Sequence, residues 1–280
     1  MPIHDQGYRR YGGTKDVRGR AWMVITRAGL RTMFGKRAFI GLLLFAWFPF
    51  FVRAVQIYAV ANLPQASQYL SIGPETFRQF LDQQQIFVFF ITVYAGAGLI
   101  ANDRRANALQ IYLSKPLTRA EYVFGKLAIL MVFLLLVTWL PAMVLLVVQI
   151  AFAGNFTFFR NNMFLFPAIT LFSAIEVVMV STAMLALSSL SSSTRFVAML
   201  YAGIIFFTTA IYGVLFGVTR STAFSWISVS ANLEQVGNAI FRLPPKYTTP
   251  WPVSLLMVVL LVVASGLVLE RRVRGVEVVA

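Results

Sequence analysis

The chain has 280 residues, of which 59% are hydrophobic and 12% are charged, and its formal net charge is +14. Because soluble domains average about 25% charged residues, this composition excludes an ordinary soluble domain and indicates an integral membrane protein. Strong positive charge suggests nucleic-acid binding in a soluble protein. In a membrane protein it sets topology and attracts anionic lipid, so we expect contact with lipid and none with nucleic acid.

The sequence contains almost none of the side chains that thiol chemistry and protein-ligated metal sites require. The chain has no cysteine and a single histidine, His4. We therefore expect no disulfide framework, no thiolate chemistry and no metal site held by protein ligands.

Residues 1–37 form a basic segment that we assign to the cytoplasm, because Lys and Arg are enriched in cytoplasmic segments. From about Val17, apolar residues such as Trp22 and Leu30 interleave with Arg27 and Arg31 at loosely helical spacing. This pattern predicts an amphipathic helix on the inner membrane face. An ordinary solvated tail is the alternative.

Six apolar runs follow, each close to the roughly 20 residues that a helix needs to cross a bilayer. They lie at about 39–60, 86–101, 127–151, 164–187, 196–218 and 251–269. The runs are long and do not alternate, so an all-α membrane protein with six transmembrane helices is predicted, rather than a β-barrel. Residues 38–270 form this transmembrane domain, and 271–280 form a short basic tail.

The segments between the runs predict the topology. Most of the lysines and arginines fall in the N-terminal segment, in 102–126 and in the tail, which predicts that both termini are cytoplasmic. Residues 61–85 are then an outer loop, and 188–195 are a short inner loop. Residues 219–250 are an outer segment with a helix in or on the interface.

Three residues within the runs carry specific expectations. Pro49 predicts a kink in the first span, and Arg53 is expected to extend its charge toward the outer surface. Glu176 is the only acidic residue in any predicted span, and it shares a helix face with Ser173. Glu176 and Ser173 could lie on a substrate path, because intramembrane carboxylates usually face a bundle interior or a wet cavity. Alternatively, Glu176 is a structural group that is neutral or is hydrogen-bonded to Ser173, Thr170 or another span.

Two sets of small residues predict close helix packing. Gly96 and Gly98 end the second span, and Gly213 and Gly217 form a G-x-x-x-G pattern in the fifth. Small residues allow the backbones of membrane helices to approach closely. Each set could pack within one subunit or against a second copy.

The polar segment 102–126 separates the second and third spans and contains the most distinctive pattern in the sequence. Asp103, Arg104 and Arg105 open it, an apolar patch of Ile111, Tyr112 and Leu113 interrupts the charge, and a turn follows. The turn and the start of the next helix contain Lys115, Pro116, Arg119 and Glu121. Charges of this kind cannot lie in hydrocarbon, so the segment belongs at the cytoplasmic surface.

With this segment placed inside, the chain resembles the permease subunit of type-2 ABC transporters. The resemblance rests on Gly98 through Lys126, in which an acidic residue precedes Leu-Ser-Lys-Pro-Leu-Thr-Arg, a Tyr and a Gly-Lys pair that opens the third span. Over the rest of the chain the resemblance is weaker and rests on the six-span layout. The sequence departs at Ala106-Asn107-Ala108, where family members often have a glycine.

The resemblance implies an amphipathic coupling helix that docks on a separate ABC ATPase subunit. Ile111, Tyr112 and Leu113 would anchor it, while Asp103, Arg104, Arg105, Lys115, Pro116, Arg119 and Glu121 would orient it. The resemblance also implies an exporter that works as a homodimer or heterodimer. ATP and Mg²⁺ would bind to the partner subunit, and this chain would need no cofactor of its own.

Other functions remain open at this stage. A membrane scaffold that recruits cytoplasmic partners through the same segment is one alternative, and an intramembrane enzyme centred on Glu176 is another. Neither Gly7 to Thr14 nor Gly29 to Arg37 matches a phosphate-binding loop, so we expect no ATPase activity from this chain. A cell membrane is the expected location. The sequence does not indicate the substrate.

Overall fold

The computed structural model describes residues 21–63, 65, 70–108, 118–153 and 157–273. These residues form helices, and no strand occurs among them. The helices are α1 (Ala21–Phe34), α2 (Arg37–Phe45), α3 (Phe48–Asn62), α5 (Pro74–Ile91), η1 (Thr92–Gly96), α6 (Ala101–Arg105), α8 (Arg119–Val137), α9 (Trp139–Phe152), α10 (Thr157–Asn161), α11 (Leu165–Leu190), α12 (Thr194–Thr219), η2 (Thr222–Ile227), α13 (Val229–Ile240) and α14 (Trp251–Arg272).

Six helical segments in the described part of the chain are long and apolar enough to cross a membrane, which confirms the predicted fold class. They are Arg37–Asn62, Pro74–Arg105, Arg119–Phe152, Leu165–Leu190, Thr194–Thr219 and Trp251–Arg272. Three of them combine shorter helices. The second joins α5, the π-helical turn η1 and α6, and the third joins α8 and α9.

Helix breaks in the first and third spans lie close to prolines. The first span is interrupted between α2 and α3, and Pro49 lies in the first turn of α3, at the position expected for the kink. In the third span the break falls at Thr138, three residues before Pro141. A proline lacks the backbone N–H that would continue the preceding helical turn, which explains both interruptions.

Two predicted loop boundaries were wrong. Residues 74–85 are not part of an outer loop, because α5 begins at Pro74 and continues into the second span. The span therefore includes Asp82, so Glu176 is not the only acidic residue within the spans. Ser188 and Ser189 also lie within a helix, since α11 continues to Leu190, and both side chains are buried.

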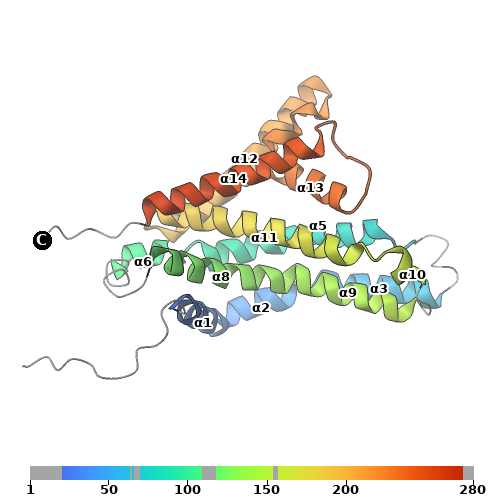
Figure 1. Ribbon diagram of the computed structural model, residues 1–280, viewed down its shortest axis with the longest axis horizontal. Helices are drawn as coiled ribbons and strands as arrows, with labels where there is room; N and C mark the ends of the chain where they lie inside the picture. Colours follow the sequence, from blue (N-terminus) through green and yellow to red (C-terminus); the bar gives the residue numbers. More distant parts are fainter. Residues whose placement is uncertain (1–20, 64, 66–69, 109–117, 154–156, 274–280) are drawn as a thin grey trace, which may run out of the picture.

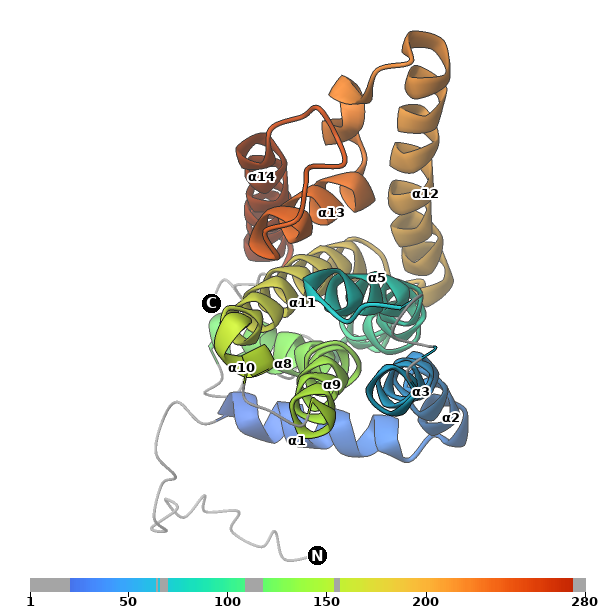
Figure 2. The same ribbon diagram turned by 90° about the vertical axis from the view of Figure 1, so that its right-hand side faces the viewer.

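The spans divide into a buried group and a peripheral pair. In Figure 1 the spans built from α3, α5, α8, α9 and α11 run side by side, whereas α12 and α14 diverge from them. Within its most apolar stretch, α11 is 67% buried and α12 is only 6% buried. The end view in Figure 2 shows α12 standing away from the central helices, with α13 and α14 across from it. Most of α12 is therefore uncovered in a single chain.

The N-terminal helix α1 crosses beneath the spans and packs against the start of α8 (Figure 2). Close backbone approach makes this contact possible. A Cβ atom added at Gly125 would lie 2.9 Å from Cβ of Ile25 and 3.0 Å from the carbonyl oxygen of Trp22. The hydroxyl of Thr26 donates a hydrogen bond to the carbonyl oxygen of Gly125 at 3.1 Å. The absence of a side chain at Gly125 thus lets the Thr26 hydroxyl of α1 reach the backbone of α8.

The same end of the molecule holds α1, α6 and the end of α14 (Figure 1). On α1, Met23, Val24, Arg27 and Arg31 are exposed. These exposed side chains are of the mixed apolar and basic kind expected at a membrane surface. The interfacial position of α1 stays a prediction.

We predict that Gly125→Leu separates α1 from α8. The added side chain would meet Ile25 and the backbone of Trp22, so neither neighbour can give way without moving α1. Overpacking of this kind costs about 1–3 kcal/mol. A lower thermal unfolding temperature and faster proteolysis between α1 and α2 are expected. Gly41→Leu is the matched control, because nothing lies within 4 Å of that position. Equal behaviour of the two variants would contradict this packing.

Candidate functional site

The acidic residue of the 102–126 segment lies at the centre of a polar junction between the second and third spans. Asp103 on α6 accepts a hydrogen bond from the hydroxyl of Tyr122 at 2.7 Å. The ammonium group of Lys126 lies 2.7 Å from the same carboxylate oxygen, and both charged side chains are largely buried. Lys126 also lies 5.6 Å from the centre of the Tyr122 ring. One carboxylate therefore links α6 to two residues of α8.

Serines of α11 extend this junction to the fourth span. The hydroxyl of Ser188 accepts hydrogen bonds from the backbone N–H groups of Ile100 and Ala101, each at 3.0 Å, and donates one to the carbonyl oxygen of Ala97 at 2.9 Å. The guanidinium of Arg104 donates to the carbonyl oxygen of Ser189. Ser188 thus supplies partners to backbone groups where the second span changes from η1 to α6.

The fifth span joins the junction through its first residue. The hydroxyl of Thr194 on α12 donates a hydrogen bond to the side-chain oxygen of Asn102 at 3.0 Å. Asn102 immediately precedes Asp103 in α6. The short helix α6 consequently makes side-chain contacts with α8, α11 and α12. We call Asn102, Asp103, Arg104, Tyr122, Lys126, Ser188, Ser189 and Thr194 the junction.

Thr118 and Glu121 form a capping box at the start of α8. The Glu121 carboxylate accepts hydrogen bonds from the backbone N–H and hydroxyl of Thr118, at 3.0 and 2.9 Å. The backbone N–H of Glu121 donates to the Thr118 hydroxyl at 3.2 Å. This reciprocal arrangement satisfies N–H groups at a helix start. Glu121 therefore has a structural role in α8 beyond the partner contact expected from the resemblance.

The remaining residues assigned to partner contact are only partly described. Arg105 and Arg119 are exposed on either side of the undescribed stretch 109–117. Ile111, Tyr112, Leu113, Lys115 and Pro116 fall outside the described residues. The structure thus places the two ends of the segment, and those ends converge on the junction.

Glu176 is buried in α11 and lies on the wall of a cavity of about 530 Å³. Its Oε2 atom has no hydrogen-bond partner among the described residues. The buried hydroxyl of Ser173 is also unpaired, so the predicted Glu176–Ser173 hydrogen bond is absent there. Thr170, the other predicted partner, instead donates to the carbonyl oxygen of Phe166. Ser173 does not line the cavity.

The four glycines have different surroundings. A Cβ atom at Gly96 would meet the side chains of Met184 and Leu130, so Gly96 lets η1 pack closely against α11 and α8. At Gly98 it would meet the side chain of Asn102. Nothing lies within 4 Å of such an atom at Gly213 or Gly217. Packing of the second glycine pair within the described part of the chain is therefore not observed.

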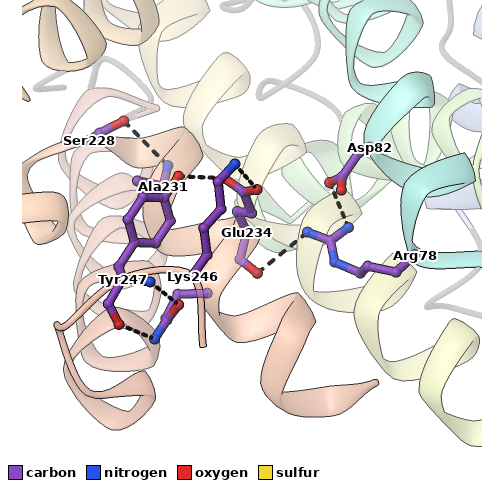
Figure 3. Close-up of polar contacts among 8 residues, drawn as sticks. Arg78, Asp82, Ser228, Ala231, Glu234, Lys246 and Tyr247 are labelled. Carbon is purple, nitrogen blue, oxygen red and sulfur yellow. Dashed lines mark hydrogen bonds and ion pairs between the residues drawn. The ribbon is translucent and has the colours of Figure 1, made fainter. Parts of the chain in front are cut away.

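A second charged cluster lies at the opposite end of the bundle and was not recognised in the sequence (Figure 3). Arg78 on α5 is 2% exposed, lies 2.7 Å from Asp82 and donates to the carbonyl oxygen of Glu234 at 3.5 Å. Its guanidinium also lies 4.4 Å from the centre of the Phe172 ring. Arg78 thus contacts α11 and α13. The i,i+4 spacing of Arg78 and Asp82 was the available signal for this helix.

The carboxylate of Glu234 continues the cluster toward α14. Lys246 lies 2.6 Å from one of its oxygens, and the hydroxyl of Tyr247 donates to the other. Burial and the neighbouring carboxylate raise the pKa of Tyr247, so its phenol remains a hydrogen-bond donor at neutral pH. These contacts hold the segment after α13 against α13 itself, which makes the cluster a structural element in our interpretation.

The junction predicts a charge-pair dependence. Asp103→Lys should leave Lys126 beside a like charge, and Lys126→Asp should leave Asp103 beside a second carboxylate. Removing one partner of a buried ion pair costs about 3–5 kcal/mol. Each single variant should therefore lower stability in detergent. The double variant Asp103→Lys/Lys126→Asp should recover much of the loss. A double variant as unstable as the sum of the singles would show that the pair contributes no specific interaction.

Residues 23–271 match the family described as ABC-2 family transporter protein. A comparison with curated proteins found no match. The match begins within α1, ends one residue before the end of α14 and includes both described ends of the 102–126 segment. This chain therefore belongs to the ABC-2 transporter family and is a multi-pass membrane component of an ABC transporter.

Proposed function

We propose that this chain is the permease subunit of an ATP-driven exporter and couples ATP hydrolysis by a separate ABC ATPase subunit to substrate movement. The observation that carries the proposal is the junction, because it connects both ends of the 102–126 segment to the spans. Family membership supports an ATPase partner. ATP and Mg²⁺ bind to that partner, and this chain acts as the transport subunit without an ATPase site of its own.

The junction supplies a physical route for coupling. Asp103 contacts α8, Arg104 contacts α11, and Asn102 contacts α12. A displacement of the 102–126 segment would therefore act on four spans together through short polar contacts. Packed helices move between discrete arrangements and do not deform continuously. The π-helical turn η1 directly precedes α6 and is a place where the second span can change its geometry.

Docking on the ATPase is assigned to Ile111, Tyr112 and Leu113, with basic residues around them. Arg105 and Arg119 are exposed at the two described ends of the stretch, so their charges are available to a partner. Exposed charges mainly steer encounter and set orientation, while a buried apolar anchor supplies most of the affinity. Lys115 and Pro116 belong to the same proposed surface. The exposed face of α1 offers a second contact.

A second permease copy is assigned to the uncovered side of α12. Phe206, Phe207 and Val214 are exposed there, and Gly213 and Gly217 have no neighbour within the described chain. Small residues on an apolar helix permit close approach of another membrane helix. The same surface suits a homodimer or a heterodimer. Both chain ends are assigned to the cytoplasmic side of a cell membrane, together with the 102–126 segment.

The coupling assignment predicts that Ile111→Asp/Tyr112→Asp/Leu113→Asp releases the ATPase. Loss of an apolar anchor costs about 2 kcal/mol or more, which is about a thirtyfold loss of affinity. The tagged chain would be purified in mild detergent from its native membrane. Two quantities are measured: the amount of nucleotide-binding partner that copurifies with the chain, and the rate of vanadate-sensitive ATP hydrolysis. Both should fall steeply in the triple variant.

Pro245→Asp is the control, because Pro245 is exposed and lies far along the chain from the 102–126 segment. This variant should retain the partner and the ATPase activity. A triple variant that folds, keeps its ATPase partner and hydrolyses ATP normally would overturn the coupling assignment. Loss of a partner that has no nucleotide-binding site would instead favour a membrane scaffold.

A further inference from the structure

The cavity beside Glu176 lies between two groups of helices. Gln85 and Phe89 of α5 and Glu176 of α11 line one side, while Tyr201 of α12, Leu233 of α13 and Ser265 of α14 line the other. Its volume of about 530 Å³ falls within the range of small-molecule sites, about 300–1,000 Å³. The wall is mostly apolar, with a few polar groups. This composition is typical of a site that binds a largely apolar molecule.

The cavity borders the surface that faces lipid. Its lining includes Ile86 and Phe90 on α5 and Ile204 on α12, and all three side chains are exposed. They belong to spans, so their exposed surfaces face hydrocarbon in a membrane. A ligand would therefore enter sideways from the bilayer. Molecules that already concentrate in membranes are the natural occupants.

The unpaired carboxylate oxygen distinguishes this cavity from a gap that lipid tails could fill. Glu176 is 1% exposed, and its Oε2 atom has no partner among the described residues. An acyl chain would leave this oxygen unpaired, and an unpaired polar group in an apolar environment costs several kcal/mol.

No cation of the described chain forms an ion pair with Glu176, and the charge of Arg78 acts on it only from a longer distance. The three ion pairs among the described residues are Arg78–Asp82, Lys126–Asp103 and Lys246–Glu234. The guanidinium of Arg78 already pairs with Asp82 and donates to the carbonyl oxygen of Glu234. The carboxylate therefore offers an acceptor to a donor that must come from outside the described chain.

We infer that this cavity binds lipophilic amines, with the ligand ammonium group at the Glu176 carboxylate and its apolar body among the side chains of α5, α11 and α12. A charge-assisted hydrogen bond of this kind is about twice as strong as a neutral one. Low local polarity strengthens it further. As a statement about the exported substrate, the inference rests on the proposed function. Binding itself can be measured on this chain without an ATPase.

The test is equilibrium binding of radiolabelled adamantylamine to the purified chain in lipid nanodiscs, with empty nanodiscs subtracted. Adamantanol serves as the neutral probe of the same shape. The intact chain should bind the amine saturably and more tightly than the alcohol. Glu176→Gln should weaken amine binding at least about tenfold and leave alcohol binding nearly unchanged. This substitution keeps the side-chain shape, so folding should be preserved.

A second variant tests the cavity. Ala183→Phe places a ring in the lining and should weaken both probes, while Ala210→Phe, at an exposed position of α12 outside the lining, should weaken neither. Absence of saturable amine binding, or equal affinity in the intact chain and Glu176→Gln, would overturn the inference. Either result would leave ATPase coupling through Ile111 to Leu113 untouched. Conversely, saturable amine binding by the purified chain, together with no copurifying ATPase from the native membrane, would overturn the proposed function alone.

Discussion

Polar groups inside hydrocarbon must find partners within the protein, and the described structure is organised around that constraint. Arg53 in the first span donates to the side-chain amide oxygens of Gln56, Gln79 and Gln83. Arg78 of α5 pairs with Asp82 and donates to the carbonyl oxygen of Glu234 on α13. Ser188 bonds to three backbone groups where the second span changes its helical form. In each case a polar side chain connects helices that hydrophobic contact alone would not place uniquely.

Two features of the described chain lack partners within it. Glu176 remains unpaired on a cavity wall, and α12 leaves most of its apolar surface uncovered. The first feature points to a small ligand and the second to another membrane helix. The junction differs from both, because Asp103 is paired within the chain with Tyr122 and Lys126. In the proposed function the junction transmits movement between spans, and the partner surface lies in the segment that it holds.

The sequence was informative where local composition decides the structure. Long apolar runs predicted six spans, and Pro49 predicted the break between α2 and α3. Charge patterns misled where a tertiary or i,i+4 partner neutralises the charge. Arg78 and Asp82 suggested a solvated loop, yet they pair within α5. Ser188 and Ser189 similarly suggested a loop, because their partners Ala101 and Arg104 on α6 are 87 and 85 positions away in the chain.

For the candidate site, the pattern around Asp103 singled out the 102–126 segment, but it did not indicate the partners of the carboxylate. Tyr122 and Lys126 were visible as parts of the motif, and only the fold shows that both reach Asp103. The cavity could not have been predicted, because five helices contribute to its wall. Glu176 was recognisable as an intramembrane acid, whereas its lack of a partner depends on the surrounding helices.

The most direct test of the central claim is the intact mass of the complex extracted with native lipid from its own membrane. If the chain is a permease subunit, the complex should contain two permease chains and two ATPase chains. Its mass should increase by that of bound nucleotide when ATP and Mg²⁺ are added. An isolated chain under conditions that preserve other membrane complexes would contradict the account. So would a stable complex whose partner does not bind nucleotide.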